Sequence, residues 1–286
     1  MTLKVVSDST CDLPEAVIQA LGITIIPVYI NIGDRGYLDG VEITRQEFYV
    51  NLPNYTSHPT TGAPGPEAFR QVYERLAASG ASEILSIHIG GSVSATVNVA
   101  QTGAKECSQA AIRVWDSRQL SLGTGFQVEL AARMAREGKP VDEIVSALAD
   151  MNSRTFVAAR LETLIYLQRS GRMNAVMTGL GSLLQLKPII TMQEGRLGSE
   201  RVRTIARAEA RLIEMLIARQ PVEKFALLHS NAPEQAEAFR LRSAHLIPAE
   251  QVQSIDITPV IGAHIGPGAV GFAVVSRKSK NEGSSE

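Results

Sequence analysis

The sequence has little cysteine, few aromatic residues and no long apolar run. Its two cysteines, Cys11 and Cys107, have no metal-ligand spacing, so we expect free thiols in a reducing compartment. Aromatic residues make up 5% of the chain, which disfavours a surface that stacks on nucleic-acid bases. No stretch reaches the length of a membrane span, and Met1–Asp8 leads into a strand pattern without a signal-peptide core. These features predict a soluble, cytoplasmic protein.

The chain also lacks an excess of charge of either sign. It has 28 basic and 29 acidic residues and a formal net charge of −1, so no overall field attracts a polyanion. We therefore expect no nucleic-acid partner. With 286 residues, the chain is longer than most single domains, which favours two.

The common nucleotide and nucleophile motifs are missing. Neither a Walker loop nor a Gly-x-Gly-x-x-Gly fingerprint occurs. The run from Gly90 to Ser94 lacks the closing glycine of a Gly-x-Ser-x-Gly elbow. Nucleotide binding and an elbow-type hydrolase thus lose their usual sequence support.

Residues 1–153 show strand patterns that alternate with helix patterns. The expected strands are Leu3–Val6, Ile23–Ile32 (interrupted by a proline), Ile84–Ile89 and Ile112–Trp115. This alternation predicts an N-terminal α/β domain with a mostly parallel sheet and helices on both faces. Ligands of such sheets bind beyond the carboxyl ends of the strands. Polar loops follow these strands here, including Gly90–Thr96 and Ser121–Gly125, and a further polar loop over Thr60–Pro66 follows a helix pattern over Glu42–Leu52.

The pattern changes after residue 153, where we place a domain boundary. Residues 154–276 predict a C-terminal α/β domain with a mixed sheet, including a hairpin over Lys187–Val202 and a helix over Asn174–Leu186. Within it, Ala263–Gly271 is expected to form a strand, a rigid loop and a second strand. Residues 277–286 have no apolar side chain to bury and are expected to be a disordered tail.

Two groups of side chains are candidates for a site. Hydroxyl groups gather at Thr61 and over Ser92–Thr96, where a helix N-terminus favours a carboxylate or phosphate, although Ser94 could simply cap its helix. Arginines that could recognise such an anion, or only solvate the surface, lie in the second domain. The basic candidates are Arg169, Arg172, Lys187, Arg201 and Arg203.

Four aspartates could be mistaken for metal ligands. They are Asp8, Asp12, Asp39 and Asp116. Their spacing matches no known ligand loop, so caps and turns explain them better, and we predict no bound metal.

His264 lies in a glycine-rich stretch that ends at Gly271. The glycines and Pro267 suit either a tight connection or a backbone shaped to hold a ligand. Residues alone leave these two interpretations open.

Taken in order, the motifs resemble the DegV family, which includes the fatty-acid-binding subunits of bacterial fatty acid kinase. The matching motifs are Ser7-Asp8-Ser9-Thr10 with Asp12-Leu13, Tyr37 to Gly40, Thr61 to Phe69, Ser94-Ala95-Thr96, Asp116-Ser117 with Ser121 to Gly125, Ser170-Gly171-Arg172, Leu186 to Ile190, and His264 to Gly271. The resemblance implies two α/β domains with one fatty acid held in a cleft between them.

The resemblance also implies roles for particular residues. Thr61 and Ser94 would bind the carboxylate, while His264, Arg172 and Arg203 of the second domain would lie nearby and could assist. The further ligand-binding candidates are Gly62, Ser92, Thr96 and Gly266. The sequence departs from the family pattern at Gly62, Gly65, Gly91 and Ala95, which leaves ligand preference open.

By this resemblance the protein is a lipid carrier with no cofactor and no catalytic residue of its own. A separate kinase subunit would phosphorylate the bound acid, and contacts with an acyltransferase and the membrane surface would be transient. The alternative is a stand-alone small-molecule transferase or esterase that uses Ser94 with His264. The residues leave open the length of the bound acyl chain and the oligomeric state of the protein.

Overall fold

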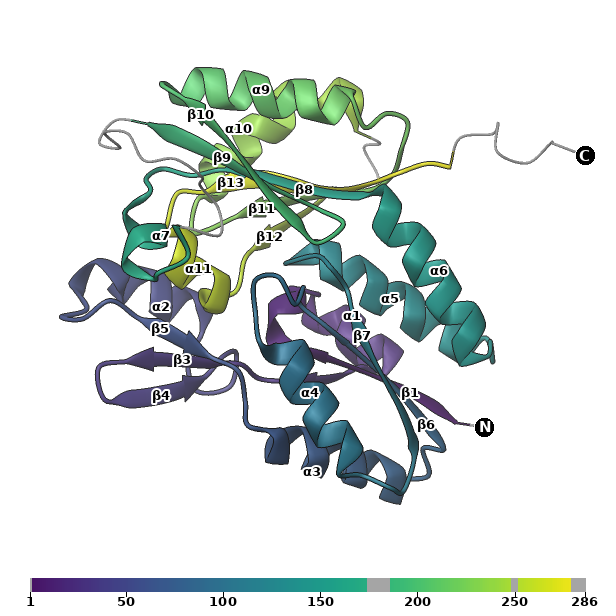
Figure 1. Cartoon of the computed structure of the whole chain (residues 1–286). Coiled ribbons are helices and arrows are strands. Elements are labelled where there is room, and N and C mark those ends of the chain that lie inside the picture. The colour runs from purple at the N-terminus through teal and green to yellow at the C-terminus, as the bar shows by residue number, and fades with distance from the viewer. Residues whose placement is uncertain (1, 174–185, 248–251, 279–286) are drawn as a thin grey trace, which may run out of the picture.

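The computed structural model describes residues 2–173, 186–247 and 252–278, and Figure 1 shows their arrangement. The first half of the chain builds a four-stranded sheet in the order β2-β1-β6-β7, and every neighbouring pair is parallel. Its strands are β1 (Leu3–Asp8), β2 (Thr24–Ile26), β6 (Glu83–His88) and β7 (Ala111–Asp116). The predicted parallel sheet is therefore confirmed.

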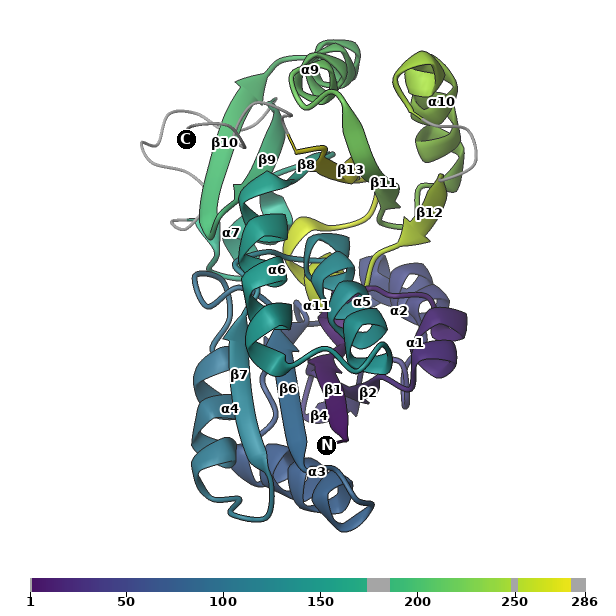
Figure 2. The same cartoon turned by 90° about the vertical axis from the view of Figure 1, so that its right-hand side faces the viewer.

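Helices cover both faces of this sheet, as predicted. On one face, α3 (Pro66–Ala78) and α4 (Thr96–Lys105) pack over an apolar layer that includes Phe69 and Ile84. On the other face lie α1 (Glu15–Leu21) and α5 (Leu122–Arg136). Figure 2 shows the sheet between these two helical layers.

The second half of the chain builds a six-stranded mixed sheet in the order β10-β9-β8-β13-β11-β12. Only β11 and β12 pair in parallel, and the other neighbours are antiparallel. The strands are β8 (Thr155–Arg160), β9 (Lys187–Gln193), β10 (Arg196–Val202), β11 (Val222–His229), β12 (Gln253–Asp256) and β13 (Val270–Ser276). The predicted mixed sheet and the β9–β10 hairpin are confirmed.

The two sheets share a helical layer. On the outer face of the second sheet lie α9 (Ile205–Ile217) and α10 (Pro233–Ser243). Its inner face packs against α5 and α6 (Val141–Arg154), and α5 also contacts the first sheet. One hydrophobic core therefore runs through both halves. Because α6 leads directly into β8, no loop marks the predicted boundary after residue 153, and the division into domains stays a prediction.

A third, small sheet lies beside the first and corrects the expected loop over Thr60–Pro66. Residues Thr60–Gly62 form β5, which pairs antiparallel with β3 (Tyr29–Ile32), and β3 also pairs with β4 (Arg35–Leu38). The partner of β5 is about thirty residues away in the chain, so local turn signals could not indicate it. The α2 helix (Arg45–Asn51) follows this hairpin.

The expectation of two strands over Ala263–Gly271 is wrong in its first half. Residues Pro259–Ile265 form the α11 helix. The Thr258 hydroxyl accepts a hydrogen bond from the Val260 N–H at 3.2 Å, and Pro259 occupies the first turn, where its fixed φ suits a helix. Gly266 ends the helix at φ 74°, and only then does β13 begin.

The expected loop over Ser121–Gly125 is also corrected, because α5 already begins at Leu122 and contains Thr124. Short turns complete the described elements: η1 (Ser9–Cys11), η2 (Leu52–Asn54), α7 (Ile165–Arg169) and η3 (Ala244–Leu246). The helix expected over Asn174–Leu186 lies almost wholly outside the described residues.

The predicted disordered tail over residues 277–286 can be checked only at its start. At that start, the Arg277 N–H donates to the Pro221 carbonyl at 2.7 Å, and residues 279–286 lie outside the described part of the chain.

Cys11 and Cys107 are free and buried, and burial raises the pKa of Cys11 to about 12. Among the residues described, no helix combines the length and apolar character that a membrane span needs.

Candidate functional site

A cavity of about 640 Å³ lies where the two halves of the chain meet. Its wall is mostly apolar and draws on both halves of the chain, for example on Val28 and Ile89 from the first half and on Val157, Met192 and Leu228 from the second. This volume falls in the range typical of small-molecule sites.

Most of the predicted site residues line this cavity. They are Thr61, Gly62, Ser92, Ser94, Thr96, Arg172 and His264. Gly266 and Arg203 are not part of its lining. Gly266 caps α11, where a Cβ would meet the Tyr166 ring at 2.2 Å. Arg203 is exposed in the bend between β10 and α9.

Thr61 and His264 meet across the cavity wall. The Thr61 Oγ1 of β5 lies 3.0 Å from the His264 Nε2 of α11, and 203 residues separate the two in the chain. The other ring nitrogen, Nδ1, is buried without a hydrogen-bond partner among the described residues. Pairing with Thr61 fixes the orientation of the ring.

Burial keeps the His264 ring neutral. Loss of solvent lowers its pKa to about 4, and the nearby positive charges of Arg172 and then of His58 act in the same direction. At neutral pH the ring is therefore a fixed dipole, and the positive charge at this end of the cavity belongs to Arg172. The Arg172 side chain is exposed and bonds to the Ser170 carbonyl at 3.0 Å.

Ser94 and Thr96 lie where the loop after β6 enters α4. The Ser94 Oγ lies 2.8 Å from the Thr96 Oγ1 and also accepts the Thr96 N–H at 3.3 Å. The alternative in which Ser94 caps its own helix thus holds in part. Because the first turn of a helix presents unpaired N–H groups, these hydroxyls stand at an end that favours an anion.

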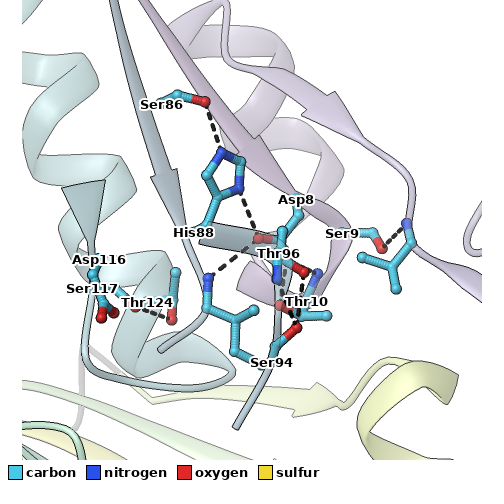
Figure 3. A network of polar contacts seen from close by, with 12 residues as sticks. Asp8, Ser9, Thr10, Ser86, His88, Ser94, Thr96, Asp116, Ser117 and Thr124 are labelled. Carbon is cyan, nitrogen blue, oxygen red and sulfur yellow. Dashed lines mark hydrogen bonds and ion pairs between the residues drawn. The ribbon is translucent and has the colours of Figure 1, made fainter. Parts of the chain in front are cut away.

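A buried hydrogen-bond network around Asp8 and His88 holds the end of β6, from which this loop starts, as Figure 3 shows. The Asp8 carboxylate lies 2.9 Å from the His88 Nδ1 and accepts the Ile89 N–H at 3.2 Å. His88 continues to Ser86 through Nε2, and Thr10, which lines the cavity, donates to Asp8 through both its N–H and its hydroxyl. The hydrogen bonds to Asp8, that from His88 foremost, outweigh its burial and lower its pKa.

Two further aspartates, Asp12 and Asp39, join the two halves of the chain. The Asp12 Oδ1 accepts the Thr258 N–H at 2.8 Å, and its Oδ2 accepts the Ser121 hydroxyl at 2.6 Å. The Asp39 Oδ2 accepts the Thr258 hydroxyl at 2.5 Å. The Arg45 guanidinium reaches Asp12 at 3.0 Å. These contacts fix the start of α11, the helix that carries His264.

Sequence reasoning assigned these aspartates to caps and turns, which is true only for part of their contacts. Asp8 does cap η1, but its bond to His88 and the bonds of Asp12 and Asp39 to Thr258 span 80 to 246 residues. No local pattern indicates such partners. Within the described part of the chain, no three His, Cys, Asp or Glu side chains gather as a metal site requires.

The chain resembles known proteins over nearly its whole length. The model of the family described as "Uncharacterised protein, DegV family" matches residues 2–277. The chain belongs to the DegV family. A DegV domain-containing protein of Streptomyces coelicolor is 36% identical over 280 residues, covering 96% of this chain and 99% of its own.

Solved DegV structures share this fold. A DegV family protein from Thermus thermophilus, described as binding fatty acid, has a TM-score of 0.87 and 32% identity over 97% of this chain and all of its own. DegV from Bacillus subtilis, described as a fatty acid binding protein, has a TM-score of 0.87 and 26% identity with the same coverage.

The buried Asp12 carboxylate generates a prediction about pH. Burial raises the pKa of Asp12 from 3.8 to about 6, with Arg45 opposing. Below its unfolded pKa this group contributes its full stability, which is lost as the pH rises through the folded pKa. Relative to Asp12→Asn, the unfolding free energy of the natural protein should fall by roughly 2 kcal/mol from about pH 4 to about pH 7.

Denaturant titrations at several pH values measure this difference. The Asn side chain keeps an acceptor for the Thr258 N–H, so the variant should fold. Asp142→Asn, which removes an exposed carboxylate of α6 that pairs with Arg113, is the matched control. A difference between Asp12→Asn and the natural protein that stays constant with pH would contradict the prediction.

Proposed function

We propose that this protein binds one long-chain fatty acid in the cavity and presents its carboxylate to a fatty acid kinase subunit in the cytoplasm. The observation that carries the proposal is the contact between Thr61 and His264 at the wall of a mostly apolar cavity. The fatty acid binding described for the Thermus and Bacillus relatives supports it.

The acyl chain supplies most of the affinity in this proposal. Burial of about 16 carbons contributes on the order of 10 kcal/mol at about 0.8 kcal/mol per methylene. One hydrogen bond to a charged carboxylate adds only about 1.5 to 3 kcal/mol. Thr61 and Ser94 therefore mainly fix the orientation of the acid and keep its carboxylate at the polar end.

Neutral His264 prepares Thr61 for that role. If the Nε2–H donates to the Thr61 oxygen, the Thr61 hydroxyl proton is free to point at a carboxylate oxygen. The unpartnered Nδ1 then carries only a lone pair, and no buried N–H is left unpaired. This tautomer leaves Thr61 as the donor and His264 as the group that positions it.

Arg172 supplies the charge for phosphoryl transfer. A carboxylate oxygen of the bound acid attacks the γ-phosphorus of the ATP that the kinase holds, ADP leaves, and an acyl phosphate forms. Arg172 stands at the cavity wall beside His264, where its guanidinium can neutralise part of the incoming negative charge. The apolar cavity then shields the reactive anhydride from water.

The side-chain pairing disfavours the alternative of an esterase. A serine nucleophile needs a base within hydrogen-bond reach. Here the Ser94 hydroxyl pairs with Thr96, while His264 pairs with Thr61. The described residues therefore form no Ser94–His264 dyad.

Native mass spectrometry after mild purification tests ligand binding directly. We expect an added mass equal to one long-chain fatty acid, because a fully buried acyl chain dissociates slowly. Delipidated protein that fails to regain this mass when incubated with free fatty acid would contradict the proposal.

Thr61→Val and Ser94→Ala test the head-group contacts. Each should weaken fatty acid binding roughly 10- to 100-fold, the worth of one hydrogen bond to a charged group, while a long-chain alcohol of equal length should lose less. Competition with a fluorescent fatty acid measures both ligands. Thr102→Val, which removes a hydroxyl bonded to its own helix, is the control. Losses no greater than the control's would argue against these contacts.

Arg172→Ala and His264→Ala test the link to phosphoryl transfer. With a fatty acid kinase and ATP, Arg172→Ala should slow acyl-phosphate formation roughly 100-fold, because a charge that stabilises the transition state is lost. Its affinity for the acid should change much less. Arg240→Ala on α10, which pairs with Glu237, serves as control. Unchanged rates in both cavity variants would refute the roles of these residues.

A further inference from the structure

His229 is a polar side chain on the cavity wall that the proposed function does not use. It ends β11, lines the cavity and is 7% exposed. Its neighbours on the wall, such as Leu228, Ile257 and Val260, are apolar. Burial of an imidazole is costly unless its ring nitrogens form hydrogen bonds, so both nitrogens of His229 are expected to have partners.

The Nδ1 atom of His229 is already engaged. It accepts the Ala232 N–H at 3.3 Å and lies 3.4 Å from the Asp256 Oδ1, which itself accepts the Asn231 N–H at 2.7 Å. A neutral ring that accepts a hydrogen bond at Nδ1 carries its proton on Nε2, and a charged ring carries one there too. The other neutral tautomer, with its Nδ1–H toward Asp256, would leave the Ala232 N–H without this acceptor, so the contact with Ala232 favours Nε2 as the donor.

No described residue accepts a hydrogen bond from this Nε2–H. The residue is more than nine-tenths buried, so bulk solvent does not satisfy the donor, yet the atom is not sealed among protein atoms as the His264 Nδ1 is. An unpaired donor on the wall of a mostly apolar cavity indicates an acceptor on the ligand.

His229 lies away from the head-group end of the cavity. Its ring is close to Asp256, and its carbonyl accepts the Ile257 N–H at 2.8 Å, just before α11 begins. His264 stands in the last turn of that helix. The helix begins at Pro259, and from there to His264 a rise of 1.5 Å per residue gives about 7.5 Å along its axis. A carboxylate at Thr61 therefore leaves the His229 donor for an atom further along the acyl chain.

We propose that His229 is a specificity-determining residue that selects fatty acids with an oxygen substituent, such as a hydroxyl or keto group, within the acyl chain. This inference rests on the proposed fatty acid binding and narrows its ligand class. A saturated chain offers the Nε2–H no acceptor, whereas an oxygen at the matching depth accepts its hydrogen bond. The apolar wall on either side disfavours an oxygen at other depths.

A positional series tests the inference with the full-length protein. The probes are a saturated acid and keto acids of the same length with the oxygen moved one carbon at a time, measured by competition after delipidation. We expect one position, or two adjacent ones, to bind roughly 10-fold tighter than the other keto acids, the worth of about one neutral hydrogen bond. A methyl branch at the favoured position should bring no such gain, because it adds bulk without an acceptor.

Substitution of the ring provides the second arm. In His229→Phe the positional preference should vanish while the saturated acid still binds, and in His229→Gln, whose amide keeps a donor, part of the preference should return. Binding of the saturated acid without any positional preference in the natural protein, or a preference that persists in His229→Phe, overturns the inference alone. Failure to bind any of these acids overturns the proposed function itself.

Discussion

The two hydrogen bonds that Thr258 makes to buried aspartates hold the site together. Its N–H binds Asp12 and its hydroxyl binds Asp39, and the same hydroxyl caps the first turn of α11. Burial of two carboxylates is costly, and it raises the pKa of both. The arrangement is tolerable because hydrogen bonds and Arg45 compensate part of this cost. Its result is a helix whose start is fixed against the first half of the chain.

From that fixed start, the rest of the polar end follows. The α11 helix is only seven residues long, so His264 in its last turn stands at a set distance from Thr258. This position brings the ring to Thr61 on β5, a strand of the other half. At the far end, Gly266 takes a positive φ and leaves room for the Tyr166 ring, where any side chain would collide. The helix is thus held at both ends.

The elements that the sequence predicts well are those with local signals. The strands β1, β6 and β7 stand out as short apolar runs, and Glu194-Gly195 marks the hairpin between β9 and β10. The α11 helix had a local signal as well, a threonine before it, a proline as its first residue and a glycine after it, but the apolar residues between them fit a strand equally well. The β5 strand had none, because only its pairing with β3 makes it a strand.

The candidate site divides in the same way. Hydroxyl groups at strand ends and the glycines around His264 are visible in sequence, which is why Thr61, Ser94 and His264 could be selected. The supports behind them could not be, because Asp8 reaches His88 across 80 residues and Asp12 reaches Thr258 across 246. Neither could the tautomer of His229, which depends on the N–H of Ala232 in the turn after β11.

Polar groups at two depths constrain a ligand more than a single head-group site does. One end of the cavity carries Thr61, Ser94 and Thr96, and His229 stands further along a mostly apolar wall. Gly62 adds no hydroxyl at the first end, although a Cβ there would meet only Asn31 at 3.7 Å. Space is therefore not the reason for the glycine. In the proposed complex, the lack of a hydroxyl at Gly62 makes the position of the fatty acid depend more on contacts along its acyl chain, and there the His229 donor at a defined depth has its greatest effect on which chain fits.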